Sequence, residues 1–165
     1  MQESCDVKFF HNHHAPKHQL KLAFRKAGLK MLVQMAPTRW GSLINMTKTL
    51  LAAEEVLLQL VSSQDFVRGT AAQKAERQVI LDLIGNPTFV PYLLKMIEIL
   101  SPIDSAIVFY QSDSVPISEV YCTFASKLPA SINAMTLIDG PERQYLLILV
   151  KKRMSFMNGD AHGIA

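Results

Sequence analysis

The sequence predicts a mainly α-helical protein, and three observations lead to this prediction. Apolar residues recur every three or four positions over most of the chain, which is the helical period. Prolines and glycines fall between these stretches, where they end one helix or begin the next. Hydrophobic residues make up 49% of the 165 residues, which is enough for a folded core. We therefore expect one ordinary domain, or part of a larger protein, built from helices with a single strand near its front.

The first 40 residues are predicted to form a helix and then the strand. An apolar stripe that includes Leu20 and Phe24 repeats at helical spacing, and Gly28 supplies a stop. The next apolar run, over residues 29–35, is short and ends before Pro37. Its length and its flanks are typical of one buried strand.

The rest of the chain is predicted to form six helices. The first is expected to be the longest, because its apolar stripe runs for more than five turns, and Ser42 is expected to cap it. Ser101 is expected to be the N-cap of the fourth helix, with Pro102 as that helix's first residue. The sixth opens at Pro141-Glu142. The expected ranges are 43–61, 71–84, 89–100, 102–110, 120–128 and 141–154.

Positive charge is concentrated at the front of the chain. Residues 1–48 hold 8 basic and 2 acidic residues, whereas the remainder holds 9 basic and 12 acidic residues. Four of the five histidines also lie in the front segment: His11, His13, His14 and His18. A polyanion would find its most favourable surface here. The alternative interpretation is a solvated basic face with no ligand, and the sequence leaves both open.

The sequence gives no support for a secreted protein, a membrane protein or a protein with a cysteine-based metal or redox site. Cys5 and Cys122 lie far apart and match no metal or redox spacing, so we expect reduced thiols in an intracellular protein. We expect no membrane partner, because no signal peptide opens the chain and no apolar run reaches the roughly 18 residues of a membrane helix. The methionines stand singly on apolar stripes, which is typical of core packing.

Local metal or catalytic sites are also weakly supported. Glu54 and Glu55 are adjacent in the middle of a predicted helix, so they point about 100° apart and are typical of a solvated edge. His11, His13 and His14 could contribute to a zinc site, but the sequence shows no companion ligand pair at a suitable spacing. The plainer interpretation is a polar helix start.

Several segments resemble the hAT superfamily of DNA transposases. They are the run from Val7 to His14, the block Pro37-Thr38-Arg39-Trp40-Gly41-Ser42, and the terminal run from Asp160 to Ala165. More exactly, the chain resembles the central part of transposase-like proteins of plants, fungi and oomycetes. The resemblance covers most of the chain, and the Arg-Trp block is its specific motif.

The resemblance implies an architecture and an activity for the parent protein. Family members have a ribonuclease-H-like core that is interrupted after its last strand by a helical insertion domain. Residues 1–40 would then be the closing helix and strand of that core, and residues 41–165 an incomplete all-helical insertion. Members cut and rejoin DNA with three carboxylates that hold divalent metal ions such as Mg²⁺. Those carboxylates are expected outside this chain, so we expect no catalytic residue, no metal ligand and no cofactor in it, and no enzymatic activity of its own.

The resemblance and the charge together predict DNA contact through Arg39, Trp40, Lys30 and Arg25. An indole can stack on a base that has left its duplex, and a guanidinium can hold a phosphate. The structural alternative is that Trp40 only fills the joint between core and insertion. DNA is therefore the expected partner, a homo-oligomer is a second expectation for the parent protein, and the expected location is nuclear or cytoplasmic. The rival hypothesis is an all-helical protein-interaction module with no DNA role.

Overall fold

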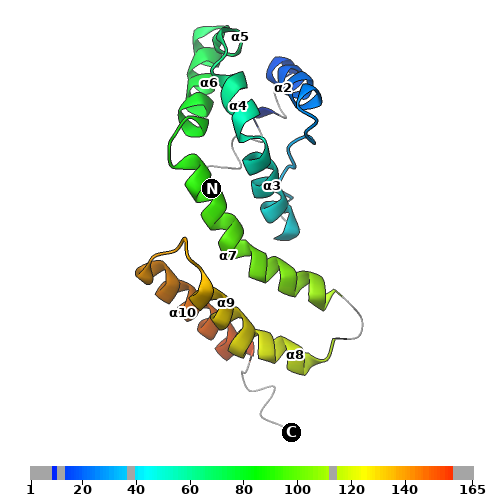
Figure 1. Ribbon diagram of the computed structural model, residues 1–165, viewed down its shortest axis with the longest axis vertical. Helices are drawn as coiled ribbons and strands as arrows, with labels where there is room; N and C mark the ends of the chain where they lie inside the picture. The colour runs from blue at the N-terminus through cyan, green and yellow to red at the C-terminus, as the bar shows by residue number, and fades with distance from the viewer. Residues whose placement is uncertain (1–8, 11–13, 37–39, 112–114, 158–165) are drawn as a thin grey trace. The chain divides into compact units, whose positions relative to one another are not determined.

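The computed structural model describes residues 9–10, 14–36, 40–111 and 115–157 (Figure 1). All regular elements of these residues are helices, so the predicted mainly α fold is confirmed. The chain divides into two compact units, residues 1–96 and residues 97–165, and each is described by itself. Among the described residues, no helix is both long enough and apolar enough to cross a membrane.

The first unit is built around helix α4. It contains α2 (His14–Lys26), α3 (Trp40–Ala52), α4 (Glu54–Val61), α5 (Gln64–Val67), α6 (Ala71–Ile84) and the beginning of α7 (Phe89–Tyr110). α4 packs against both α2 and α6 (Figure 1). Its residues Leu57 and Val61 are fully buried, in one cluster with residues of the two neighbouring helices. Those neighbours are Leu20 and Phe24 of α2, and Ile80 and Ile84 of α6.

Aromatic contacts join the N-terminal residues Phe9 and Phe10 to Phe66 of α5. The ring centroids of Phe9 and Phe10 lie 6.0 and 6.1 Å from that of Phe66, which is fully buried. Arg77 of α6 lies over the same ring, at 5.8 Å from its centroid, and donates a hydrogen bond to the Phe66 carbonyl. Aromatic pairs at such distances add to the stability that burial alone provides. Phe9 and Phe10 are therefore part of the core of this unit.

The prediction of a strand over residues 29–35 is wrong. Residues 29–36 have no regular secondary structure, although Leu32 is buried in the core. A strand must pair its N–H and C=O groups with a neighbouring strand, and the described residues contain none. Side-chain hydroxyls of α3 bond the backbone of this segment instead. Thr49 accepts a hydrogen bond from the N–H of Val33, and Ser42 accepts one from the N–H of Ala36 and donates one to its carbonyl.

The helix predicted over residues 43–61 begins earlier and is broken in two. α3 begins at Trp40, so Ser42 lies inside its first turn and bonds Ala36 rather than capping the helix. The helix ends at Ala52, and α4 starts after Ala53, whose φ and ψ of −104° and 3° are not helical. The apolar stripe continues across this break, and alanine is the best helix former. Local sequence therefore carries no sign of the break.

The two helices predicted over 89–100 and 102–110 are one helix, α7, with 22 residues and Pro102 in its interior. Ser101 is not an N-cap, because its hydroxyl donates to the carbonyl of Ile97 at 2.6 Å. A proline inside a helix removes one backbone hydrogen bond, here the one to the carbonyl of Glu98. α7, and not the segment over 43–61, is the longest element described.

The second unit combines the end of α7 with a nearly continuous helical stretch and α10. The stretch consists of α8 (Ile117–Cys122), the π-helix η1 (Thr123–Lys127) and α9 (Leu128–Ala134). α10 (Gly140–Met157) packs against α9 and η1, and the predicted opening at Pro141-Glu142 is confirmed. A capping box starts α10, since Asp139 accepts from the N–H of Glu142 while Glu142 accepts from the N–H of Asp139.

The domain boundary predicted at residue 40 falls inside the first unit. The core of that unit takes Phe10, Leu20 and Phe24 from before the boundary, and Met46 and Leu50 from after it. The assignment of residues 1–40 to a remnant of a ribonuclease-H-like core, and of residues 41–165 to an insertion, stays a prediction.

Replacing Leu57 by Ala tests the central position of α4. Leu57 is 0% exposed, so truncation leaves a cavity and we expect the unit to lose about 2–5 kcal/mol of unfolding free energy. The neighbouring Leu58 is 37% exposed, and Leu58→Ala should cost less than about 1 kcal/mol. Urea unfolding followed by the fluorescence of the chain's one tryptophan, Trp40, reports on this unit. Equal midpoints for the two variants would contradict the packing described.

Candidate functional site

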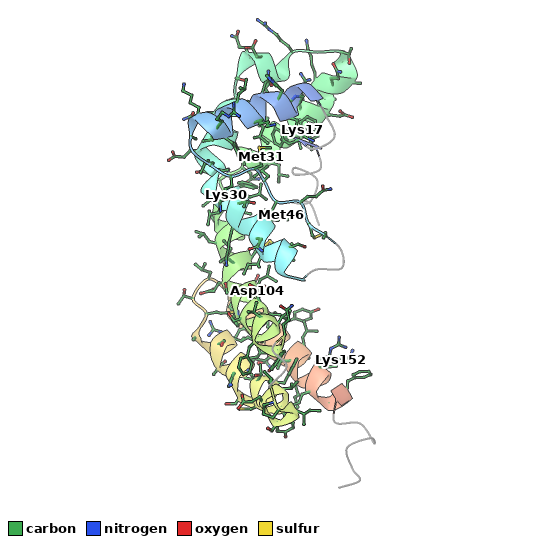
Figure 2. All side chains as sticks on the ribbon, turned by 90° about the vertical axis from the view of Figure 1, so that its right-hand side faces the viewer. Lys17, Lys30, Met31, Met46, Asp104 and Lys152 are labelled. Carbon is green, nitrogen blue, oxygen red and sulfur yellow. The ribbon has the colours of Figure 1, made fainter. Side chains whose placement is uncertain are left out.

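A row of cations runs along the exposed side of α2. Lys17, Lys21 and Arg25 are four residues apart and all exposed, and they flank the side of the helix that buries Leu20 and Phe24. Residues four apart lie next to one another on a helix surface. Lys17, Lys21 and Arg25 are called the α2 row below. Figure 2 labels Lys17 on this helix and Lys30 on the segment that follows it.

The cations of the α2 row repel one another along the helix. Like charges four residues apart destabilise a helix by about 0.2–0.5 kcal/mol per pair. No acidic residue lies close to them in the sequence, because residues 7–53 contain eight basic residues and no acidic one. Arg25 and Lys26 do gain from the helix dipole, since they lie in the last turn. That gain does not extend to Lys17 and Lys21.

A glycine turn places Lys30 just beyond the end of α2. Gly28 has a φ of 69°, which side-chain-bearing residues rarely adopt. The N–H of Gly28 donates to the carbonyl of Arg25 at 3.3 Å, and the N–H of Leu29 to that of Phe24 at 2.9 Å. This is the Schellman arrangement that ends many helices. It gathers the predicted residues Arg25 and Lys30, both exposed, around one turn.

The other two predicted DNA-binding residues cannot be placed in the same way. Arg39 lies outside the described residues, and Trp40 is described only as the first residue of α3. The ends of this segment are tied together, because the hydroxyl of Ser42 lies 2.9 Å from the N–H and 3.0 Å from the carbonyl oxygen of Ala36. The roles predicted for Arg39 and Trp40 stay predictions.

Glu54 and Glu55 occupy a different place from the one predicted. They are in the first turn of α4, not in the middle of a helix, because the chain breaks at Ala53. Carboxylates at a helix N-terminus are stabilised by the dipole, which accounts for both residues structurally.

The predicted histidine and cysteine positions add no assembled site. His11, His13 and Cys5 lie outside the described residues, and His14 opens α2. Cys122 is a free, half-buried thiol. Within the described ranges, no group of three or more His, Cys, Asp or Glu side chains is placed to hold a metal ion.

A groove of about 660 Å³ lies in the second unit, between α7 and the stretch formed by η1 and α9. Its walls combine apolar side chains with four hydroxyl groups and with one charged residue of each sign, Glu98 and Lys127. A concave surface of this size is within the range of ligand sites in proteins. The remaining lining residues are Ser101, Pro102, Ser105, Ala106, Phe109, Thr123, Leu128, Ser131, Ala134 and Met135.

The π-helix forms part of one wall of this groove. Thr123 and Lys127 are its first and last residues, and both line the groove. The Lys127 ammonium donates to Glu119 at 2.8 Å and lies 5.7 Å from the centroid of the Phe109 ring. The hydrogen bond to Glu119 raises the pKa of Lys127. π-helical turns are rare and are frequent at functional sites.

Glu98 connects α7 to the loop that precedes α10. Its carboxylate accepts hydrogen bonds from the N–H groups of Thr136 and Leu137, at 2.8 and 2.9 Å, and from the Thr136 hydroxyl at 3.2 Å. The bond from the Thr136 N–H is the largest cause that holds the pKa of Glu98 below its ordinary value.

Sequence reasoning missed the groove residues. Glu98 finds its partners 38 and 39 residues further along the chain, so no local pattern marks it. The π-helix does leave a trace, because the buried positions Thr123, Leu128 and Ile132 are spaced by five and then four residues. This spacing is not recognisable from the sequence alone, because threonine is a polar residue and is not counted when apolar periodicity is analysed.

Comparison with known proteins identifies no relative of this chain. No family model matches the sequence, and neither the curated proteins nor the solved structures yield a match. The resemblance to hAT transposases therefore stays a prediction carried by the Arg-Trp block and the segments around it.

Glu98→Gln tests the connection between α7 and the loop. Glutamine keeps one acceptor oxygen but turns an amide N–H₂ towards a backbone N–H, so we expect a loss of about 1–2 kcal/mol at pH 7. Asp104→Asn, on the same helix (Figure 2), is the matched control and should change little. Thermal unfolding followed by circular dichroism measures both.

The pH dependence of the same comparison has a defined sign. Because folding lowers the pKa of Glu98, its stabilisation is complete above the ordinary carboxyl pKa of about 4.3. The stabilisation is lost as the pH falls through the lowered folded-state pKa. The difference between the parent chain and Glu98→Gln should therefore shrink in acid. A difference that is constant from pH 7 to pH 2 would contradict this role of the ionised carboxylate.

Proposed function

We propose that the chain is part of an hAT-type, transposase-like protein whose first unit contacts DNA through the α2 row and the adjoining Lys26 and Lys30. One observation carries the proposal: a segment free of acidic residues presents exposed cations along one helix and at its end. The predicted contacts Arg25 and Lys30 belong to this surface. The Arg-Trp block that carries the family resemblance follows directly in the sequence.

The geometry of the α2 row fits a polyanion. From Lys17 to Arg25 the row extends for about 12 Å at the helical rise of 1.5 Å per residue. Duplex DNA carries about one negative charge per 1.7 Å of its axis, so each cation of the row has several phosphates within reach. A bound phosphate chain would also relieve the repulsion within the row.

The proposal includes no catalytic step. The resemblance places the three metal-binding carboxylates of the family outside this chain, so the cations of the first unit bind and position DNA rather than cut it. A nuclear location of the parent protein is part of the same proposal.

The double variant Lys21→Gln with Arg25→Gln tests the DNA contact. We expect weaker binding to a duplex, and a plot of log affinity against log salt concentration whose slope is shallower by about 2. Fluorescence anisotropy at several salt concentrations measures both quantities. The control is Lys74→Gln with Lys151→Gln, which removes the same charge from exposed positions on α6 and α10. Equal slopes for the two double variants would place the DNA contact elsewhere.

The single variant Lys21→Gln should be more stable than the parent at low salt. It removes both like-charge pairs of the α2 row, a gain of about 0.4–1 kcal/mol, and it keeps Arg25 in the last turn, where the helix dipole favours a cation. This gain should fade as salt screens the charges. Greater stability together with weaker binding distinguishes a ligand-binding row from a merely solvated face. A variant that binds less DNA because it is less folded would show the opposite change in stability.

Trp40→Ala tests the proposed stacking role. Stacking on an aromatic ring contributes about 1–3 kcal/mol per base, so binding to single-stranded or flipped-out ends should weaken by roughly 5- to 150-fold. Binding to a fully paired duplex should change far less. Trp40→Phe keeps an aromatic face and should restore most of the affinity for single-stranded ends. If the alanine variant weakens both substrates equally, Trp40 has the structural role instead.

A second candidate function is a helical protein-interaction module, and the groove of the second unit favours it. The groove has apolar walls of two helices, which is the form of a receptor for a partner's amphipathic helix. Salt dependence separates the two functions: DNA binding weakens steeply with salt, whereas insertion into an apolar groove does not. A chain that binds no DNA but associates with a protein partner independently of salt would favour the module.

A further inference from the structure

The buried hydroxyl of Thr123 lines the groove of the second unit without a hydrogen-bond partner. Thr123 is 4% exposed and is the first residue of the π-helix η1. Its backbone is paired, since its N–H donates to the carbonyl of Glu119 and its carbonyl accepts from the N–H of Leu128. Among the described residues, none donates to its hydroxyl or accepts from it. Buried polar groups normally have a partner, so this hydroxyl points to a ligand that supplies one.

The groove has the shape of a site for a helix. On α7 its lining runs from Glu98 to Phe109, which is about 16 Å at the helical rise of 1.5 Å per residue. The two walls are antiparallel, because Phe109 lies beside Lys127 whereas Glu98 bonds Thr136. A third helix fills a groove that two helices form over about three turns, whereas a compact small molecule fills only part of it. Small side chains on both walls let such a helix approach closely: Ser101, Ser105, Ala106, Ser131 and Ala134.

Hydrogen-bonding capacity is concentrated at the end of the groove formed by Thr123, Lys127 and Phe109. The Lys127 ammonium has three donors, and within the described part of the chain it uses one of them, for Glu119. At the other end, the Glu98 carboxylate already accepts three hydrogen bonds. A neutral amide suits the Thr123 end better than a carboxylate does, because Glu119 already balances the charge of Lys127 and would repel a second carboxylate.

We infer that the groove binds an amphipathic helix of a partner protein whose apolar face carries one carboxamide, from glutamine or asparagine, at the end beside Thr123 and Lys127. The carboxamide oxygen accepts from the Lys127 ammonium, and the carboxamide N–H₂ donates to the Thr123 hydroxyl. The inference rests on the second candidate function, the interaction module, and names the chemistry of its partner. It is independent of DNA binding by the first unit.

Three synthetic peptides of about 14 residues test the inference, each a helix with leucine and alanine on one face and a fluorescent label at one end. They differ at one position in a terminal turn of the apolar face, which holds glutamine, leucine or glutamate. Fluorescence anisotropy with the full chain, at up to about 0.5 mM, measures binding. We expect the glutamine peptide to bind at least about fivefold more tightly than either of the others, because leucine covers the Thr123 hydroxyl without pairing it and glutamate faces Glu119.

Thr123→Val separates a ligand contact from a role in folding. Valine has a similar shape without the hydroxyl, so this variant should prefer the leucine peptide to the glutamine peptide by at least about threefold. Its midpoint of thermal unfolding, followed by circular dichroism, should be no lower than that of the parent, because the change removes an unpaired buried hydroxyl. A preference for glutamine that survives in this variant overturns the inference.

Thr47→Val is the matched control. Thr47 is 0% exposed, but its hydroxyl donates to the carbonyl of Leu43 at 2.9 Å. This variant should therefore have a lower unfolding midpoint and the same peptide preference as the parent. If Thr123→Val lowers the midpoint as Thr47→Val does, the Thr123 hydroxyl serves the fold and the inference is overturned.

Ser105→Trp shows whether the peptides occupy the groove. Ser105 lines the groove and is exposed, so an indole at this position fills the groove without crowding the core. Binding of all three peptides should weaken by at least about tenfold, and unchanged binding overturns the inference. If the parent binds the three peptides equally well, the carboxamide contact is overturned and the interaction module stands. If it binds none of them, both are overturned.

Discussion

Burial of one face of α4 is the constraint on which the first unit depends. Leu57 and Val61 are both fully buried, in a cluster with residues of α2 and of α6, so α4 holds its two neighbours in place. α2 can bury Leu20 and Phe24 in that cluster in only one orientation about its axis. That orientation turns Lys21 and Arg25 to the solvent. The packing of a short apolar helix thus determines where the cations of another helix point.

Elements with a local signal could be predicted from the sequence. Gly28 ends α2 through a positive φ, Thr70 caps α6 by a reciprocal bond with Gln73, and Pro141 opens α10. Each of these features acts within a few residues, so each is visible in the sequence. The break at Ala53, the continuation of α7 through Pro102 and the loss of the strand after Gly28 are different. They depend on which other segments are available to pair or pack, and a single sequence does not show this.

The candidate sites also divide into those with a local sequence signal and those that depend on distant segments of the chain. The exposure of Arg25 was predictable from its charge and its helical spacing, and that of Lys30 from its charge alone, because Lys30 lies beyond the end of α2. The groove of the second unit was not, because Glu98 meets Thr136 and Leu137 only after the chain has passed through α8, η1 and α9. Arg39 and Trp40 show a further limit: a motif can indicate a function without indicating the geometry that performs it.

Departures from regular helix geometry gather around the groove. Pro102 interrupts the hydrogen bonding of α7 on one wall, and the π-helix with Thr123 and Lys127 forms part of the other wall. Such irregularities lower the stability of a helix, and where they persist they are often part of a functional surface. The walls of the groove are nevertheless mainly apolar, because the hydroxyls of Ser101 and Ser131 donate to carbonyls of their own helical stretch and Thr123 is buried.

The outer face of α10 is a second apolar surface, because its middle turns expose two aliphatic side chains beside one tyrosine. Water gains no hydrogen bonds from Ile148 and Leu149, so the free energy of that face falls when another apolar surface covers it. The groove and the outer face of α10 therefore gain free energy in the same way when a partner covers them. They differ because only the groove also carries one charged residue of each sign, Glu98 and Lys127, which can orient a partner.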